Sequence, residues 1–165
     1  MALTTPGSVD TFKRRFLADR PEEVGFAEQV IAWAMSRHLV RKWSSAAATD
    51  TLTCQASVGQ YKHKILTLQT NGLIWILFGQ LLSGFPSGDA TVKARFHKQL
   101  SDRLGKIPGG NSLPTAYKSK ASWRLSDMNV PAFLGVTDWM LSDLHKTHEA
   151  TVALHASNRT RHLGR

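Results

Sequence analysis

The sequence predicts an α+β domain in which a three-stranded antiparallel meander packs against about four helices, in the order α-α-β-β-β-α-α. Apolar residues recur at helical spacing near both ends of the chain, whereas they alternate with polar residues from position 51 onward. An Asn71-Gly72 pair between two β-prone runs is a strong hairpin signal. With 165 residues, of which 42% are hydrophobic, we expect residues 1–156 to form a single domain and residues 157–165 to form a basic, flexible tail.

Two helices are predicted before the sheet. The first buries three apolar side chains that share one helical face, Phe12, Phe16 and Leu17. Pro21 begins the second helix, because the missing N–H of proline costs nothing in a first turn. Apolar residues then recur at helical spacing through residues 26–33. We expect this helix to run on to Arg41 and Lys42, since cations stabilise a helix C-terminus, and a small-residue connector to follow over residues 44–48.

Three strands are predicted in the middle of the chain. Residues 51–58 alternate between polar and apolar side chains, which is typical of a strand with one buried face. Gly59 turns the chain into a second strand over residues 61–69, and Asn71-Gly72 turns it into a third over residues 73–82. The third strand is apolar on both faces. We therefore expect it to be covered on both sides or to lie centrally in the sheet.

Two helices and a short strand are predicted after the sheet. The first of these helices has an amphipathic stripe that consists of Val92, Phe96, Leu100, Leu104 and Ile107. A Pro-Gly-Gly sequence ends it, a polar loop follows over residues 111–121, and residues 122–125 are expected to form a short edge strand. The last helix begins near Asp127 or Asn129 and is expected to run through Leu154. Its inward side chains are Phe133, Leu134, Val136, Met140, Leu141 and Leu144.

The charge of the chain is positive and unevenly distributed. There are 21 Lys and Arg residues against 12 Asp and Glu residues, a formal net charge of +9. Residues 1–60 contain seven basic and six acidic residues, whereas residues 61–165 contain fourteen basic and six acidic ones. The second half of the chain therefore carries nearly all of the positive field, which favours encounter with polyanions.

The strongest local excess of positive charge lies in residues 91–124, where Asp102 is the only acid. We predict that this helix-plus-loop surface binds the phosphates of DNA or RNA without catalysis. The predicted contacts are Lys93, Arg95, Lys98, Lys106, Lys118, Lys120 and Arg124. Tyr117 and Trp123 would stack on unpaired bases if they are exposed. The structural alternative is a solvated basic helix face, with Trp123 anchored in the core.

Two other functional classes were weighed. A protein-interaction or assembly module, including a homo-oligomer, would expose an apolar patch along residues 73–82 or on the last helix. An enzyme with a site built from scattered histidines and Asp138 or Asp143 has no motif support. Residues 51–88 contain no Asp or Glu, so these strands lack the carboxylates of a metal-dependent nuclease. We therefore predict no catalytic residue, no metal ion and no cofactor.

The single cysteine and the hydropathy of the chain bear on its location. Cys54 falls on the apolar face of its strand, which predicts a buried, unreactive thiol and suits a reducing compartment. The most apolar run, residues 73–82, is far short of the roughly 20 residues that span a bilayer. His145 and His148 share a helical face, but incidental surface histidines are more common than a two-ligand metal site. We expect a cytoplasmic protein with no membrane partner.

Overall fold

The computed structural model describes residues 9–45, 49–77, 89–105 and 120–163. Their order is α1 (Val9–Asp19), η1 (Pro21–Glu23), α2 (Val24–Ser36), β1 (Val40–Ser45), β2 (Asp50–Val58), β3 (Tyr61–Gln69), β4 (Leu73–Leu77), α3 (Asp89–Leu104), β5 (Lys120–Arg124), η2 (Leu125–Asp127) and α5 (Val130–Leu163). The two 3-10 turns, η1 and η2, precede α2 and α5. The predicted α+β class is confirmed.

In the described residues the sheet has five strands, not three, in the spatial order β1-β2-β3-β4-β5 with every neighbouring pair antiparallel. The three predicted strands correspond to β2, β3 and β4, and the predicted edge strand is present as β5. The described part of the third strand, β4, lies between β3 and β5, away from the sheet edges. Residues 78–82, the rest of the predicted third strand, lie outside the described residues.

Strand β1 corrects the prediction that α2 runs on to Arg41 and Lys42. The helix ends at Ser36 because His38 adopts a left-handed conformation, with φ 53°. The Leu39 N–H then donates to Ala34 O over 3.1 Å, and the His38 N–H donates to Met35 O over 3.1 Å. This pair of hydrogen bonds is the Schellman motif, which glycine usually provides. Without a glycine, the sequence carried no visible stop signal at this position.

The predicted Asn71-Gly72 hairpin is confirmed, with a different turn geometry. Leu68 pairs with Ile74 across β3 and β4, so residues 70–72 form a three-residue loop. Only Gly72 has positive φ, at 82°, while the Asn71 Oδ1 atom accepts the Leu73 N–H at 3.2 Å. Three-residue hairpin loops commonly place glycine at this last, left-handed position.

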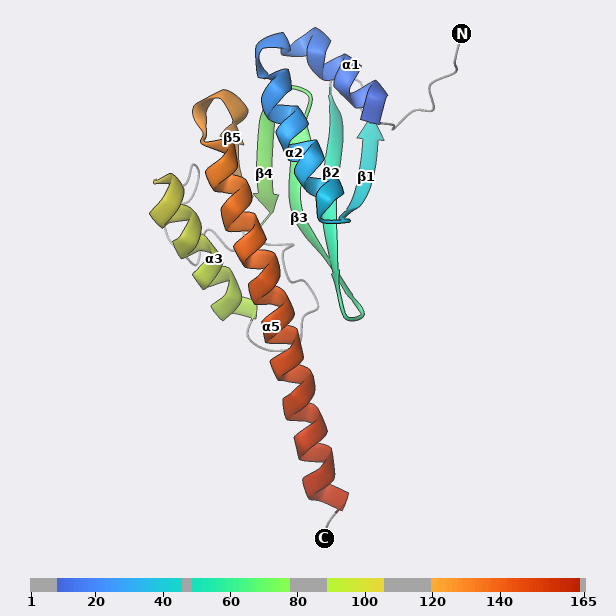
Figure 1. The fold of residues 1–165 in the computed structure, drawn as a ribbon, viewed down its shortest axis with the longest axis vertical. Helices are drawn as coiled ribbons and strands as arrows, with labels where there is room; N and C mark the ends of the chain where they lie inside the picture. The colour runs from blue at the N-terminus through green and yellow to red at the C-terminus, as the bar shows by residue number, and fades with distance from the viewer. Residues whose placement is uncertain (1–8, 46–48, 78–88, 106–119, 164–165) are drawn as a thin grey trace.

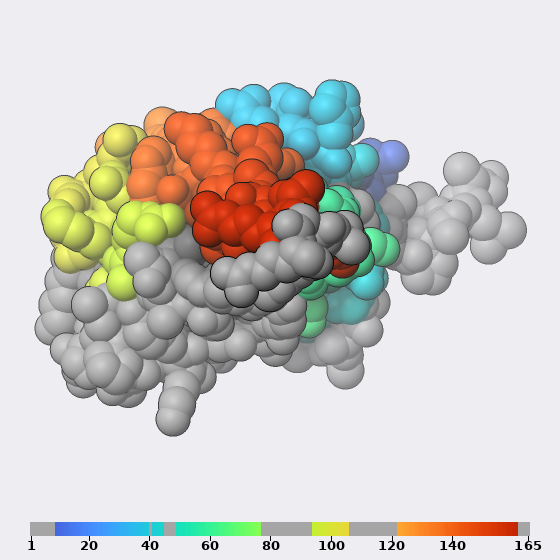
Figure 2. All heavy atoms as spheres, turned by 90° about the horizontal axis from the view of Figure 1, so that it is seen from below, coloured from blue at the N-terminus to red at the C-terminus, as the bar shows by residue number. Residues whose placement is uncertain are grey.

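All of the described helices lie on one face of the sheet or against a helix that does (Figure 1). The core includes Phe12 and Phe16 from α1, the buried side chains of α2, β2, β3 and β4, and the inward side chains of α5. Helix α3 lies beside α5, in Figure 1 and again in the view from below in Figure 2, and it buries Phe96 and Leu100. Most of the predicted inward side chains are buried, but Leu17 is exposed and Leu104 and Leu141 are only partly buried. The side chains of Val92 and Ile107, which were also predicted to face inward, lie outside the described set.

Helix α5 extends far past the end of the sheet (Figure 1). It continues through Leu163, so helical structure includes most of the segment that the sequence assigned to a tail. Two apolar side chains on this projecting half are exposed, Val152 at 53% and Leu154 at 62%. None of the helices in the described ranges is both long enough and apolar enough to cross a membrane.

Candidate nucleic-acid interface

The face of the sheet opposite the helices is built from alternate residues of each strand. In β2, Leu52, Cys54 and Val58 are fully buried toward the helices, so Thr53 and Ser57 project to the other side. Residues directly opposite each other in a ladder share a face, which extends this assignment to the other strands. We call the resulting surface the polar face. Its described side chains are Lys42, Ser44, Thr51, Thr53, Gln55, Ser57, Lys62, Lys64, Thr67, Gln69, Leu73, Trp75, Ser122 and Arg124.

Every charged residue among these side chains is basic. Lys42, Lys62 and Lys64 are exposed, and Arg124 is partly buried. Lys42 and Lys62 are not paired with an acid in the part of the chain that the structure describes. The one acid in the described strands, Asp50, projects toward the helices instead and is paired with Arg15 at 2.9 Å. The described side chains of the polar face therefore include basic groups and no acid.

Hydroxyl and amide groups fill the middle of the polar face. Thr53 and Thr67 share a hydrogen bond of 3.1 Å between their hydroxyls, and Ser44 and Thr51 share another. Trp75 lies opposite Thr67 in the β3–β4 ladder and is partly buried. Gln55, Thr67 and Gln69 are buried, however. The polar groups that this face exposes are therefore the hydroxyls of Ser44 and Ser57, with Thr53 and Trp75 partly buried. Exposed hydroxyls beside lysines suit contacts with phosphate and sugar.

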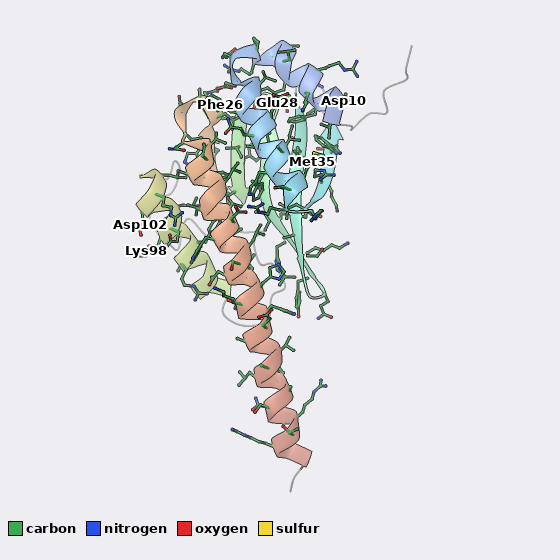
Figure 3. The ribbon with its side chains drawn as sticks, viewed as in Figure 1. Asp10, Phe26, Glu28, Met35, Lys98 and Asp102 are labelled. Atoms are coloured by element: carbon green, nitrogen blue, oxygen red, sulfur yellow. The ribbon has the colours of Figure 1, made fainter. Side chains whose placement is uncertain are left out.

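The structure pairs two of the predicted contact residues on α3 with acids. Arg95 donates to Asp143 Oδ2 of α5 through Nε at 3.1 Å and through Nη2 at 2.8 Å. Lys98 lies 2.6 Å from Asp102 on the side of α3 that faces away from α5 (Figure 3). The Asp143 contact arises because α3 packs on α5, which sequence spacing alone does not show. These two cations are partly neutralised and lie in the helical layer.

The other predicted contacts lie elsewhere. Arg124 is on the polar face, where its Nη1 donates to Asn71 O at 3.2 Å. Lys93 lies within α3 and Lys120 within β5, where it is paired with Leu77, but their side chains are outside the described set. Lys106, Tyr117 and Lys118 also lie outside the described residues.

Trp123 belongs to the core, so the exposure on which its predicted stacking role depended is absent. It is 7% exposed and meets the Phe133 ring edge-on, with 5.5 Å between ring centroids. The reason is its register, because Trp123 pairs with the fully buried Ile74 and thus faces the helices.

The end of α3 and strand β5 do come together at one place. Arg103 and Arg124 both line a cavity of about 400 Å³, with Asp127 on its wall. Two parts of the predicted 91–124 surface, the end of α3 and strand β5, therefore meet at this cavity. Arg124 belongs both to the cavity and to the polar face. Sequence reasoning missed Lys42, Lys62 and Lys64 as candidates. The alternation of Lys62 and Lys64 at spacing two was the available signal, whereas Lys42 was hidden by the wrong helix assignment.

The side chains considered for catalysis have structural partners. Asp138 accepts hydrogen bonds from Arg37 at 2.8 and 2.7 Å and from Trp33 Nε1 at 2.9 Å, which ties α2 to α5. Burial opposes ionisation of Asp138, but these hydrogen bonds and the Arg37 charge outweigh it and lower the carboxyl pKa.

Burial raises the pKa of the Cys54 thiol to about 12, so a buried, unreactive thiol is the correct interpretation. Within the described ranges, no three His, Cys, Asp or Glu side chains are grouped so that they could hold a metal ion.

No protein-family model matches the chain, and no curated protein or solved structure is significantly similar to it. The functional interpretation therefore rests on the geometry of this molecule alone.

Proposed function

We propose that the protein is a non-catalytic nucleic-acid-binding domain, and that the polar face of its sheet is the centre of the binding surface. The observation that carries the proposal is that the charges on the described part of this face, Lys42, Lys62, Lys64 and Arg124, are all positive. Cations on an exposed surface bind phosphates by releasing the counterions of the polyanion. The exposed hydroxyls of Ser44 and Ser57 supply hydrogen bonds that position a backbone without selecting a sequence.

The basic residues of positions 91–124 extend this proposed surface. Arg124 joins the polar face to the cavity beside Arg103, and Lys120 follows the same strand. Lys93, Lys106 and Lys118 stay in the proposal as phosphate contacts. Arg95 and Lys98 are expected to contribute less, because each must give up a carboxylate partner before it binds a phosphate.

The test compares two double variants with the same change in charge. Lys42→Gln/Lys62→Gln removes cations from the polar face, while Arg14→Gln/Lys146→Gln removes exposed cations from the helical layer. Fluorescence polarisation with labelled single-stranded and duplex oligonucleotides in 0.1 M salt measures affinity. Each polar-face lysine is expected to be worth about fivefold, so the first variant binds about 25-fold more weakly while the second changes little. Equal losses in both variants, or no binding by the wild type at low salt, would refute the proposal.

A second candidate function, protein–protein interaction, is favoured by one observation. The projecting half of α5 exposes Val152 and Leu154, as the assembly alternative expected of the last helix. Light scattering coupled to size-exclusion chromatography separates the two functions. A stable oligomer that a Val152→Ser/Leu154→Ser variant dissolves would favour assembly, whereas a monomer that binds oligonucleotides would favour the first proposal.

We also propose a cytoplasmic location. The only cysteine is buried, so the fold needs no oxidising compartment for its stability.

A further inference from the structure

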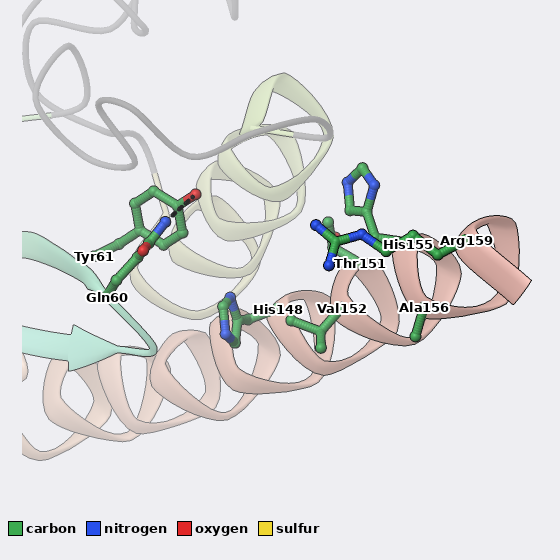
Figure 4. A pocket seen from close by; sticks show the side chains of 8 residues that line it. All are labelled: Gln60, Tyr61, His148, Thr151, Val152, His155, Ala156 and Arg159. Atoms are coloured by element: carbon green, nitrogen blue, oxygen red, sulfur yellow. Dashed lines mark hydrogen bonds between the residues drawn. The ribbon is translucent and has the colours of Figure 1, made fainter.

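A groove of about 830 Å³ opens where the β2–β3 turn meets the projecting half of α5 (Figure 4). Its described lining residues are Gln60, Tyr61, His148, Thr151, Val152, His155, Ala156 and Arg159. Among the described residues, the β2–β3 hairpin reaches further along α5 than the rest of the sheet does, and α5 continues beyond it (Figure 1). A groove of this size lies within the range of small-ligand sites, which is roughly 300–1,000 Å³.

The hairpin side of the groove is held in place by tight packing on α5. His148 lies directly on the backbone of Gly59, where any Cβ atom would collide with the imidazole. The Tyr61 ring meets His148 edge-on at 6.1 Å between centroids, and it stacks on the buried His63 at 6.3 Å. The Tyr61 hydroxyl accepts a hydrogen bond from Gln60 Nε2 at 3.1 Å. An aromatic ring with this many fixed neighbours is ordered before any ligand arrives, which lowers the entropic cost of stacking on it.

The helix side of the groove combines apolar and basic groups. Val152 and Ala156 provide apolar surface, and Arg159 and His155 provide cationic or hydrogen-bonding groups. Helical side chains lean toward the N-terminus, and the Arg159 guanidinium accordingly lies back over the preceding turn, on the side of the groove (Figure 4). None of the described lining residues is an acid.

The two sides together match one class of ligand. An aromatic wall beside apolar surface accepts a flat, partly apolar ring, and a basic end without carboxylates accepts an anion. An acidic peptide would satisfy the arginine but leave the aromatic wall unused, and an apolar peptide would bury the arginine without a partner. A nucleotide carries both features in one small unit.

We propose that this groove binds one nucleotide unit, with its base against Tyr61 and Val152 and its phosphate at Arg159 and His155. The inference rests on the proposed function, because it takes the ligand to be nucleic acid or its monomer. The unit is supplied either as an unpaired residue of a bound single strand or as a free mononucleotide. The polar face would then hold the backbone of a strand, while the groove holds one of its bases.

The test uses the full chain labelled with ¹⁵N and two ligands, adenosine monophosphate and a short single-stranded oligoadenylate. Amide resonances of residues 59–61 and 148–159 are expected to shift in the presence of at least one of them. A response to both ligands identifies a site for free nucleotide, and a response to the oligonucleotide alone identifies a site for an unpaired residue in a strand. Adenosine and inorganic phosphate, added separately, should each bind more weakly than the nucleotide.

Three variants make the assignment specific. Arg159→Gln and Tyr61→Leu should each weaken the groove's response about tenfold. Arg161→Gln removes the same charge from an exposed position of α5 outside the groove, and it should change the response less than twofold. Overlaid spectra of the free variants show that the fold is kept.

The outcomes separate this inference from the proposed function. One outcome refutes the groove as a nucleotide site but supports the polar face. In that outcome, oligonucleotide binding is weakened by substitution of Lys42 and Lys62 and unchanged by substitution of Arg159 or Tyr61. Nucleotide shifts at the groove that persist in Lys42→Gln/Lys62→Gln support the groove on its own. Shifts confined to other residues, equal losses in Arg159→Gln and Arg161→Gln, or no shifts with either ligand refute it.

Discussion

At the scale of single residues, burial determines which candidate side chains can react or contact a ligand. Cys54 and Trp123 are both buried by their register in the sheet, so neither a reactive thiol nor a stacking ring reaches the surface. The side chains of Lys42 and Lys62, by contrast, are exposed by the same alternation. The pattern of β2 predicted the burial of Cys54 from sequence, because period two is visible within one strand. The burial of Trp123 was not predictable from its own short strand, since its facing residue, Ile74, is distant in sequence.

His63 makes the stability of the hairpin sensitive to pH. It is fully buried, stacks on Tyr61 of its own strand and faces His148 of α5, while Lys62 and Lys64 project to the other side of the sheet. Burial, and then the charge of His148, lower the pKa of His63 below its ordinary value of 6.5. The unfolded chain therefore binds a proton more readily than the folded one does. Stability should fall as the pH drops from about 6.5 through the lower folded pKa.

Urea denaturation at pH 7.5 and pH 5.5 tests whether stability falls on acidification. The wild type is expected to lose more stability on acidification than His63→Phe, which keeps an aromatic ring but cannot bind a proton. The exposed His145→Gln should behave like the wild type. Part of the acid sensitivity should survive in His63→Phe, because burial lowers the pKa of His97 as well. An identical loss in the wild type and His63→Phe would contradict the assignment.

At the scale of elements, the termini of helices and the pairing of strands were the hardest to foresee. The apolar stripes of α3 and α5 predicted both helices, because a helix that packs on a sheet or on another helix buries apolar residues at the helical period. Strand β1 was missed because its basic residues also suit a helix end and because the left-handed residue that follows α2 is His38, not a glycine. The described side chains of α5 beyond Thr151 are exposed, so this half of the helix needs no apolar residues at helical spacing. Its sequence therefore offered no reason to extend the helix beyond Leu154.

The end of α2 gives a direct test of the Schellman motif. A left-handed conformation strains any residue with a Cβ, so His38→Gly should stabilise the fold by about 0.5–1 kcal/mol after the entropic cost of glycine is included. His38→Ala is the matched control, because it removes the imidazole but keeps the Cβ. The midpoint of urea denaturation at pH 7.5 should rise in His38→Gly alone. A similar rise in both variants would mean that the imidazole, and not the backbone, is the source of strain.

At the scale of the whole molecule, the core lies between the helices and one face of the sheet, and the described charges on the opposite face are basic. The helices cover one face of the sheet, and they take up Asp50, Asp138 and Asp143 in ion pairs with Arg15, Arg37 and Arg95. These three acids are therefore neutralised on the helical side of the sheet, whereas the charged side chains described on the opposite face are basic. The net charge of +9 predicted a polyanion partner in general terms. Its placement on the sheet depends on strand pairings between distant segments, which composition alone does not contain.

The central claim is that a face of the sheet binds phosphates through its cations, and the salt dependence of affinity tests it most directly. Contacts from Lys42, Lys62, Lys64 and Arg124 alone should make the logarithm of the association constant for a single strand fall with the logarithm of salt concentration at a slope of about −3. Each further phosphate contact from positions 91–124 should steepen this slope by about 0.7, and Lys42→Gln/Lys62→Gln should make it shallower by about 1.4. A slope near zero for the wild type, or one that this variant leaves unchanged, would contradict the account.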